Sequence, residues 1–128
     1  MIRILIADDH AVVREGLGRL LAQEPDFEIA GEAADGEEAV RQAGILQPDV
    51  ILMDMSMPGM NGVEAARAIS VEHPEIRIIG LSMFEEAERA QAMRDAGAVD
   101  YVSKSDPASR LIAAVRAAVR GPARGPNP

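Results

Sequence analysis

Five polar side chains in this sequence have the chemistry to handle a divalent cation and a phosphoryl group. Three are carboxylates, one is a hydroxyl and one is an ammonium, and each follows a short apolar run: Asp8, Asp9, Asp54, Ser82 and Lys104. Carboxylates that converge raise one another's pKa, and a divalent cation relieves that repulsion. Because the donors are oxygen atoms, we expect Mg²⁺ or Mn²⁺ rather than zinc.

The single lysine stands out against the other basic residues. Lys104 is the only lysine among 13 basic residues, and the rest are arginine. A solvated surface lysine is the ordinary interpretation, but this usage points to a need for a compact ammonium, which can neutralise phosphate oxygens. The Ser82 hydroxyl could donate to a phosphoryl oxygen. His10 and His73 are not at ligand spacing.

Composition limits the classes of protein that fit this sequence. The 128 residues suit one domain, and the absence of cysteine excludes a zinc finger, a cysteine protease and a thioredoxin. A net charge of −8 argues against binding nucleic acid or an anionic membrane through a general basic surface, although residues 107–128 hold four arginines and no acid. No apolar run suits a signal peptide or a membrane span, so we expect a soluble, cytoplasmic protein.

The segments that must position the polar residues alternate between apolar runs and helical patterns. The runs are nearly continuous, which is typical of parallel strands buried on both faces: residues 2–7, 27–33, 49–53, 76–81 and 100–103. A segment with helical spacing follows each run. This alternation predicts a doubly wound α/β sheet, in which ligands bind at the carboxyl ends of the strands. All five polar residues lie at such ends.

Several local signals add detail to this prediction. The sequence Ser105-Asp106-Pro107 predicts a helix cap followed by a proline in the first turn. Pro58 and Gly59 predict a turn after the third run, and Gly62 permits a close approach before the next helix. The four methionines within residues 53–60 are interpreted as core and loop packing. Residues 121–128, rich in glycine and proline, predict a linker.

Three function classes use residues of these types: a phosphorylation-switched signalling module, a Mg²⁺-dependent phosphohydrolase with an aspartate nucleophile, and a flavodoxin-like electron carrier. The glycine-rich nucleotide loops are absent. Haloacid-dehalogenase-like phosphatases use Asp-x-Asp, whereas this chain has Ser56 two residues after Asp54, and it is too short for a cap domain. A flavin carrier would need a phosphate loop and stacking aromatics that this sequence lacks. The phosphohydrolase remains the alternative.

Taken together, these residues closely resemble the bacterial response-regulator receiver domain over residues 1–120. The signature consists of the segments 7–10 (Ala-Asp-Asp-His), 54–62 (Asp-Met-Ser-Met-Pro-Gly-Met-Asn-Gly), 81–83 (Leu-Ser-Met) and 100–104 (Asp-Tyr-Val-Ser-Lys). The stretch from Asp8 to Leu17 resembles the NarL/FixJ-like subfamily, which carries LuxR-type helix-turn-helix output domains. The resemblance implies a flavodoxin-like (βα)5 fold with strand order 2-1-3-4-5.

The resemblance also implies a role for each site residue. Asp54 would accept a phosphoryl group from the phosphohistidine of a sensor histidine kinase, and both transfer to Asp54 and hydrolysis from it would be self-catalysed. Asp9 and Asp54 would bind Mg²⁺ (or Mn²⁺) directly, and Asp8 mostly through water. Backbone groups would complete the site: the Ser56 carbonyl as a metal ligand, and the Met55 and Met83 N–H groups as donors to phosphoryl oxygens.

Finally, the resemblance implies that phosphorylation changes the conformation of a signalling surface. Ser82 would move to hydrogen-bond a phosphoryl oxygen, and Tyr101 would swing into the vacated space. This would change the surface made by the fourth helix, fifth strand and fifth helix, with a possible homodimer as the result. DNA binding would come only from an output domain beyond the 121–128 linker, which is absent from this sequence.

Two positions depart from the commonest receiver pattern. Ser105 follows Lys104 where many receivers have proline, which removes the option of a cis proline bond there. Phe84 lies two residues after Ser82 and is bulky. We expect Phe84 to hinder the water that hydrolyses a phospho-aspartate, so that Phe84→Ala would speed dephosphorylation.

Overall fold

The computed structural model describes residues 1–83 and 87–121, and within them strands and helices alternate as predicted. The strands are β1 (Ile2–Ala7), β2 (Phe27–Ala33), β3 (Val50–Asp54), β4 (Arg77–Ser82) and β5 (Asp100–Ser103). The helices are α1 (Ala11–Ala22), α2 (Gly36–Leu46), α3 (Gly62–Glu72), α4 (Ala87–Asp95) and α5 (Ala108–Arg120). All strand pairs are parallel and the order is β2-β1-β3-β4-β5, which confirms the predicted fold class.

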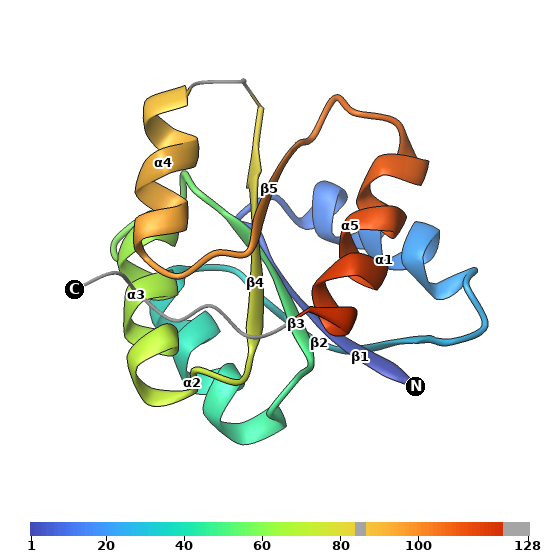
Figure 1. Ribbon diagram of the computed structural model, residues 1–128, viewed down its shortest axis with the longest axis horizontal. Helices are drawn as coiled ribbons and strands as arrows, with labels where there is room; N and C mark the ends of the chain where they lie inside the picture. Colours follow the sequence, from blue (N-terminus) through green and yellow to red (C-terminus); the bar gives the residue numbers. More distant parts are fainter. Residues whose placement is uncertain (84–86, 122–128) are drawn as a thin grey trace.

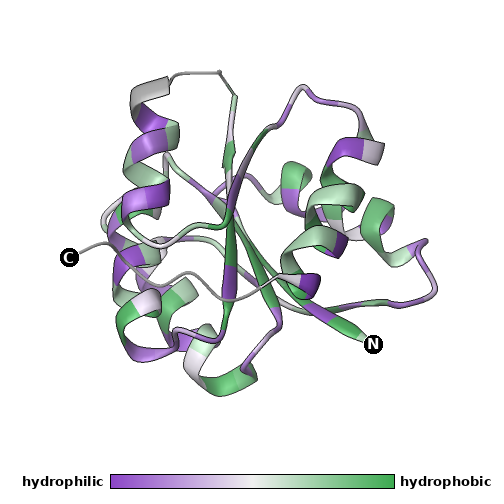
Figure 2. Cartoon of the chain, viewed as in Figure 1, coloured by the Kyte–Doolittle hydropathy of each residue, from purple (hydrophilic) through white to green (hydrophobic). Residues whose placement is uncertain are grey.

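The sheet lies between two helical layers. Figure 1 shows α1 and α5 on one face, and α2, α3 and α4 on the other. Side chains of one strand alternate between the two cores: Ile4 and Ile6 pack toward α1 and α5, whereas Leu5 and Ala7 pack toward the opposite layer. Hydrophobic residues make up much of the central strands (Figure 2), and their side chains enter both cores. Burial of both faces explains why the strands appear in the sequence as continuous apolar runs.

The strand bounds differ from the predicted ones by one residue where the site begins. β3 includes Asp54 and β4 includes Ser82, so both residues are the last of their strands rather than the first of a loop. Asp54 pairs across the ladder with Leu81, and Ser82 pairs with Ser103. The backbone of the sheet therefore fixes the starting points of both side chains.

The predicted cap of α5 is wrong. Pro107 itself is the N-cap residue, without a side-chain cap, and the helix begins at Ala108. The Asp106 carboxylate instead accepts the Ser103 N–H at 3.2 Å, and the Ser105 hydroxyl lies 2.8 Å from that of Ser103. These hydrogen bonds close the turn that carries Lys104. Because they occupy the Asp106 and Ser105 side chains, those side chains do not cap α5. Every described peptide bond is trans, including the bond between Lys104 and Ser105.

The methionines after β3 pack as interpreted. Met53, Met55 and Met57 are buried in the core on the α2–α4 side, and Met60 packs against it. Phe84 and the linker beyond residue 121 lie outside the described residues, so the expectations for them stay predictions. None of the helices in the described part of the chain is long and apolar enough to cross a bilayer.

Candidate functional site

The carboxyl ends of four strands bring the predicted residues together. Asp8 and Asp9 follow β1, Asp54 ends β3, Ser82 ends β4, and Lys104 follows β5. These four strands are consecutive in the sheet, and Figure 1 shows β1, β3 and β4 running the same way toward this edge. The edge is therefore the site that the sequence predicts.

Lys104 bridges two buried carboxylates. Its Nζ lies 2.5 Å from Asp8 Oδ2 and 3.3 Å from Asp54 Oδ1. The Asp8 residue is fully buried and Asp54 is 4% exposed. Lys104 thus faces Asp54, but its nearer partner is Asp8. One ammonium thus serves two anions in a region of low dielectric, where each interaction is strong.

Burial is the main influence on the pKa of the Asp54 carboxyl group. Desolvation raises its pKa above the ordinary value of 3.8, the Lys104 charge opposes this effect, and the Asp8 charge adds to it. The carboxylate oxygen is consequently more basic than that of an exposed aspartate. A more basic carboxylate is a better nucleophile toward phosphorus.

Hydrogen bonds between side chains and the backbone hold the turn after β1. Asp8 Oδ1 accepts the His10 N–H at 2.8 Å, and Arg14 Nη1 donates to the Asp8 carbonyl at 2.6 Å. On the other side of the site, the Lys104 N–H donates to the Ser82 carbonyl at 2.6 Å. These contacts fix the backbone from which the charged side chains project.

His10 lies beside the acidic cluster. Its Nδ1 lies 3.1 Å from Asp9 Oδ1 and 3.3 Å from Asp8 Oδ1. One ligand atom from each of four residues falls within 4.8 Å of the others: Asp8, Asp9, His10 and Asp54. The turn closed by Asp8 Oδ1 bends the imidazole back over the acids. The signal in the sequence was the direct succession Asp-Asp-His at the end of a strand.

The loop from β3 to α3 supplies close backbone contacts around Asp54. The Ser56 N–H donates to Asp54 Oδ1 at 3.3 Å. The Met55 N–H donates to the Leu81 carbonyl at 3.1 Å, so it would have to share or exchange this bond to reach a phosphoryl oxygen. A Cβ at Gly62 would lie 2.1 Å from the Asp54 carbonyl oxygen, which confirms that this position requires a close approach.

The predicted switch residues lie on the two strands beside Asp54. Ser82 is buried at the end of β4, and Met83 after it is exposed. Tyr101 on β5 is partly buried against the core on the α2–α4 side. A Cβ at Gly80 would lie 2.9 Å from Tyr101 Cδ2, so the glycine makes room for this ring.

The donor set fits a divalent cation. Asp9 Oδ1 is buried and, among the described residues, forms no hydrogen bond beyond the 3.1 Å approach of His10 Nδ1. Such an oxygen carries a desolvation penalty that a cation would relieve. The carboxylate ligands Asp8, Asp9 and Asp54 are those that Mg²⁺ prefers, and Mg²⁺ needs few of them because it retains waters.

Known proteins are similar to this chain in sequence and fold. A family model described as the response regulator receiver domain matches residues 4–116. The transcriptional regulatory protein LiaR of Bacillus subtilis is 46% identical over 121 residues, which cover 94% of this chain and 57% of LiaR. The chain spans a little more than half the length of the curated relatives it matches.

Solved structures agree with the sequence matches. A LuxR-family two-component response regulator from Aurantimonas sp. aligns with a TM-score of 0.90 and 37% identity, over 98% of this chain and 89% of that one. CheY of Borrelia burgdorferi, solved with CheX, BeF₃ and Mg²⁺, aligns with a TM-score of 0.85 and 25% identity, over 91% of this chain and 87% of that one. The chain belongs to the response-regulator receiver domains, in the branch found in LuxR-family transcriptional regulators.

Proposed function

We propose that this receiver domain accepts a phosphoryl group on Asp54 from the phosphohistidine of a sensor histidine kinase. The observation that carries the proposal is the buried Asp54 carboxylate with Lys104 Nζ 3.3 Å away. A desolvated carboxylate is a poor structural residue but a suitable nucleophile. Its neighbouring ammonium can balance the charge that an incoming phosphoryl group adds.

The chemical step is an in-line displacement at phosphorus. A carboxylate oxygen of Asp54 forms the new P–O bond while the P–N bond to the donor histidine breaks, and the electron pair of that bond stays on the imidazole nitrogen. Lys104 stabilises the phosphoryl oxygens during transfer, as cations do in other phosphoryl-transfer sites. The positioning of the reacting groups and the stabilisation of the phosphoryl charge together accelerate the transfer. Each chain accepts one phosphoryl group and does not turn over further substrate.

A divalent cation completes the charge balance. Asp9 and Asp54 would bind Mg²⁺ directly, Asp8 through water, and the Ser56 carbonyl would add a ligand. When bound, Mg²⁺ (or Mn²⁺) supplies neutralisation of the carboxylates and the phosphoryl oxygens. The mutual repulsion of Asp8 and Asp54 supports this assignment, as does the solved complex of the similar CheY with Mg²⁺.

The phosphoryl group would change the surface of α4, β5 and α5. We infer that Ser82 hydrogen-bonds one phosphoryl oxygen and that the N–H groups of Met55 and Met83 bind others. Tyr101 then follows Ser82 inward, past Gly80. The new surface supports a homodimer, and a LuxR-type output domain following residues 1–120 and a linker from residue 121 would bind DNA, as the names of the longer relatives suggest.

The alternative phosphohydrolase is not favoured. The second aspartate that such an enzyme uses is replaced by Ser56, and the matched family is a signalling domain. Nothing in the described site offers a second carboxylate two residues after Asp54.

Intact-mass measurement tests the proposal directly. Incubation with acetyl phosphate and Mg²⁺ should add about 80 Da, the mass of one PO₃H group, to the wild-type chain. Asp54→Asn should stay unmodified, and Asp26→Asn should be modified like the wild type. Release of many phosphates per chain would support the phosphohydrolase, and an adduct that persists in Asp54→Asn would refute the assignment of Asp54.

A further inference from the structure

We propose that three side chains are positioning groups for phosphoryl transfer, because they hold the Lys104 ammonium within reach of Asp54. They belong to the turn at the end of β5: Ser103, Ser105 and Asp106. The inference rests on the proposed function, in which Lys104 acts on the phosphoryl oxygens. It deepens that function by assigning residues that act only through Lys104.

Residues 103–106 form a tight turn with Lys104 and Ser105 at its two central positions. The Asp106 N–H donates to the Ser103 carbonyl at 3.1 Å, and the Asp106 carboxylate accepts the Ser103 N–H at 3.2 Å. This reciprocal pair closes the turn. On the side of the sheet, the Lys104 N–H donates to the Ser82 carbonyl at 2.6 Å. The backbone from which the Lys104 side chain starts is therefore fixed.

A pair of serines fastens the centre of the turn. The Ser105 N–H donates to Ser103 Oγ at 3.2 Å, and the two hydroxyl oxygens lie 2.8 Å apart. Ser103 is only 6% exposed, so these bonds form where the local dielectric is low and hydrogen bonds are strong. A proline at position 105 would have no N–H to donate. In this chain, side-chain hydrogen bonds therefore determine the shape of the turn.

Packing alone does not confine the Lys104 side chain. A cavity of about 140 Å³ lies between α1, α5 and the ends of β4 and β5, and both Lys104 and Asp106 line it. Lysine has a flexible four-carbon stem, and a cavity beside the stem gives it room to move. If the turn loosens, the ammonium is therefore no longer held at 3.3 Å from Asp54.

Variants of Asp106 separate its acceptor oxygen from its charge, and the chain offers a matched control. Asp106→Ala removes the acceptor for the Ser103 N–H, whereas Asp106→Asn loses the charge and keeps an acceptor oxygen. The Asp49 carboxylate also accepts a backbone N–H, that of Arg3 at 2.8 Å, but it lies just before β3 at the opposite edge of the sheet. Asp49→Ala thus removes a similar hydrogen bond far from Lys104.

Intact mass measures the rate of phosphorylation by acetyl phosphate at saturating Mg²⁺. Asp106→Ala should slow the reaction about two- to tenfold, the range expected for one lost hydrogen bond, and Asp106→Asn and Asp49→Ala should slow it less than about twofold. Lys104→Ala should slow it at least about a hundredfold. In that background Asp106→Ala should have no further effect, because the turn acts through Lys104. A general loss of stability would instead slow the reaction equally in both backgrounds.

NMR observes the ammonium without Mg²⁺ or phosphate. Lys104 is the only lysine, so the ¹⁵N signal of its ammonium needs no further assignment. Exchange of the ammonium protons with water should be at least about twofold faster in Asp106→Ala than in the wild type, and unchanged in Asp106→Asn and Asp49→Ala.

Two results would overturn the proposal: wild-type proton exchange in Asp106→Ala, or equal slowing of phosphorylation by Asp106→Ala with and without Lys104. A wild type that acetyl phosphate leaves unmodified would count against Asp54 as phosphoacceptor. The exchange measurement would then still decide whether the turn positions Lys104.

Discussion

At the amino ends of the strands, acids and arginines form pairs at the surface, whereas at the carboxyl ends two buried carboxylates share one ammonium. Arg116 binds Asp26 and, at 2.6 Å, Glu24. Lys104, in contrast, serves both Asp8 and Asp54 inside the protein. The ion pairs at the amino ends favour the ionised carboxylates. At the carboxyl ends, burial makes the ionised carboxylates energetically unfavourable.

Two aspartates show the contrast in their acidity. The hydrogen bond from Arg116 lowers the pKa of Asp26, whereas burial raises the pKa of Asp54. A pair in solvent favours the anion at little cost, but a buried anion with a shared partner is disfavoured. We interpret the amino end as structural and the carboxyl end as built for a ligand.

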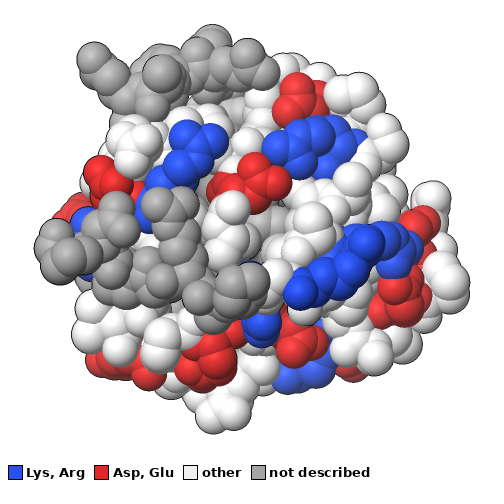
Figure 3. All heavy atoms as spheres, in the orientation of Figure 1, with Lys and Arg blue, Asp and Glu red and all other residues white. Residues whose placement is uncertain are grey.

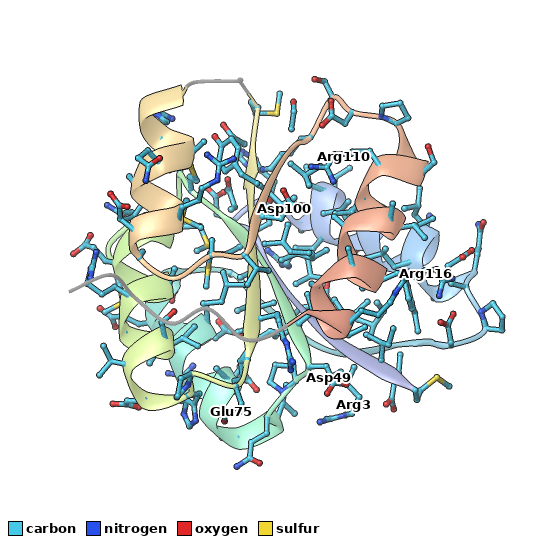
Figure 4. The ribbon with its side chains drawn as sticks, in the orientation of Figure 1. Arg3, Asp49, Glu75, Asp100, Arg110 and Arg116 are labelled. Carbon is cyan, nitrogen blue, oxygen red and sulfur yellow. The ribbon has the colours of Figure 1, made fainter. Side chains whose placement is uncertain are left out.

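The surface ion pairs have ordinary structural roles. Figure 4 shows Arg110 with Asp100 between β5 and α5, and Arg3 near Asp49. The backbone N–H of Arg3 donates to the Asp49 carboxylate at 2.8 Å, and its guanidinium pairs with Glu28 at 3.6 Å. Arg3 Nη1 also donates to the Leu46 carbonyl at 2.5 Å, which ties the end of α2 to β1. On the face shown in Figure 3, basic and acidic side chains alternate rather than forming a region of one sign. Such pairs contribute little each.

Removal of the shared ammonium should produce the largest effect. In Mg²⁺-free buffer, Lys104→Ala leaves the buried Asp8 carboxylate without its cation, and we expect a loss of about 2–3 kcal/mol in the free energy of unfolding. Denaturant unfolding measures it. Arg110→Ala is the matched control, since it removes a cation from a more exposed pair and should cost below about 1 kcal/mol. Equal losses in the two variants would remove the proposed contrast.

Addition of Mg²⁺ should stabilise only the acidic end. At a concentration ten times its Kd, a bound ion adds about 1.4 kcal/mol to the free energy of unfolding. Thermal unfolding of the wild type should reflect this gain, and Asp9→Asn should show a smaller one. NaCl at equal ionic strength is the control. A gain that NaCl reproduces would mean general screening rather than a site.

Asp54→Asn and Asp26→Asn should change stability in opposite directions. Both effects should be smaller than those of the two preceding predictions. The folded chain binds the Asp54 proton more tightly than the unfolded chain does, so stability is lost as pH rises from 3.8 through the raised pKa. Asp26 instead contributes stability above 3.8 that is lost as pH falls through its lowered pKa. At pH 7, Asp54→Asn should therefore raise the Tm by a few degrees.

Asp26→Asn should lower the Tm by less than that amount, because its partner is partly exposed to solvent. Thermal unfolding of both variants without Mg²⁺ provides the comparison. A fall in Tm for Asp54→Asn would show that its ionised form stabilises the fold.

The sequence was sufficient to predict the fold and which residues meet at the carboxyl ends of the strands. Continuous apolar runs ended at Asp8, Asp54 and Ser82, and parallel strands bring such ends together whatever the side chains do. The preference of Lys104 for Asp8 could not be predicted, because it depends on how far a flexible side chain reaches across β3 and β4. The same holds for the His10 ring, whose position follows from a turn closed by a side-chain hydrogen bond.

The α5 cap shows a second limit of sequence reasoning. Asp106 is a good capping residue by type, but the Ser103 N–H offers a competing partner in the turn. Local propensity does not decide between two donors that tertiary structure brings within reach.

Carboxyl ¹³C NMR titration of the Mg²⁺-free wild type tests the contrast between the two ends most directly. Both aspartates are observed in one sample, so temperature and ionic strength cancel. The account predicts that Asp54 titrates above 3.8 and Asp26 below it, and that Mg²⁺ lowers the Asp54 midpoint without moving that of Asp26. An Asp54 midpoint at or below that of Asp26 would contradict it.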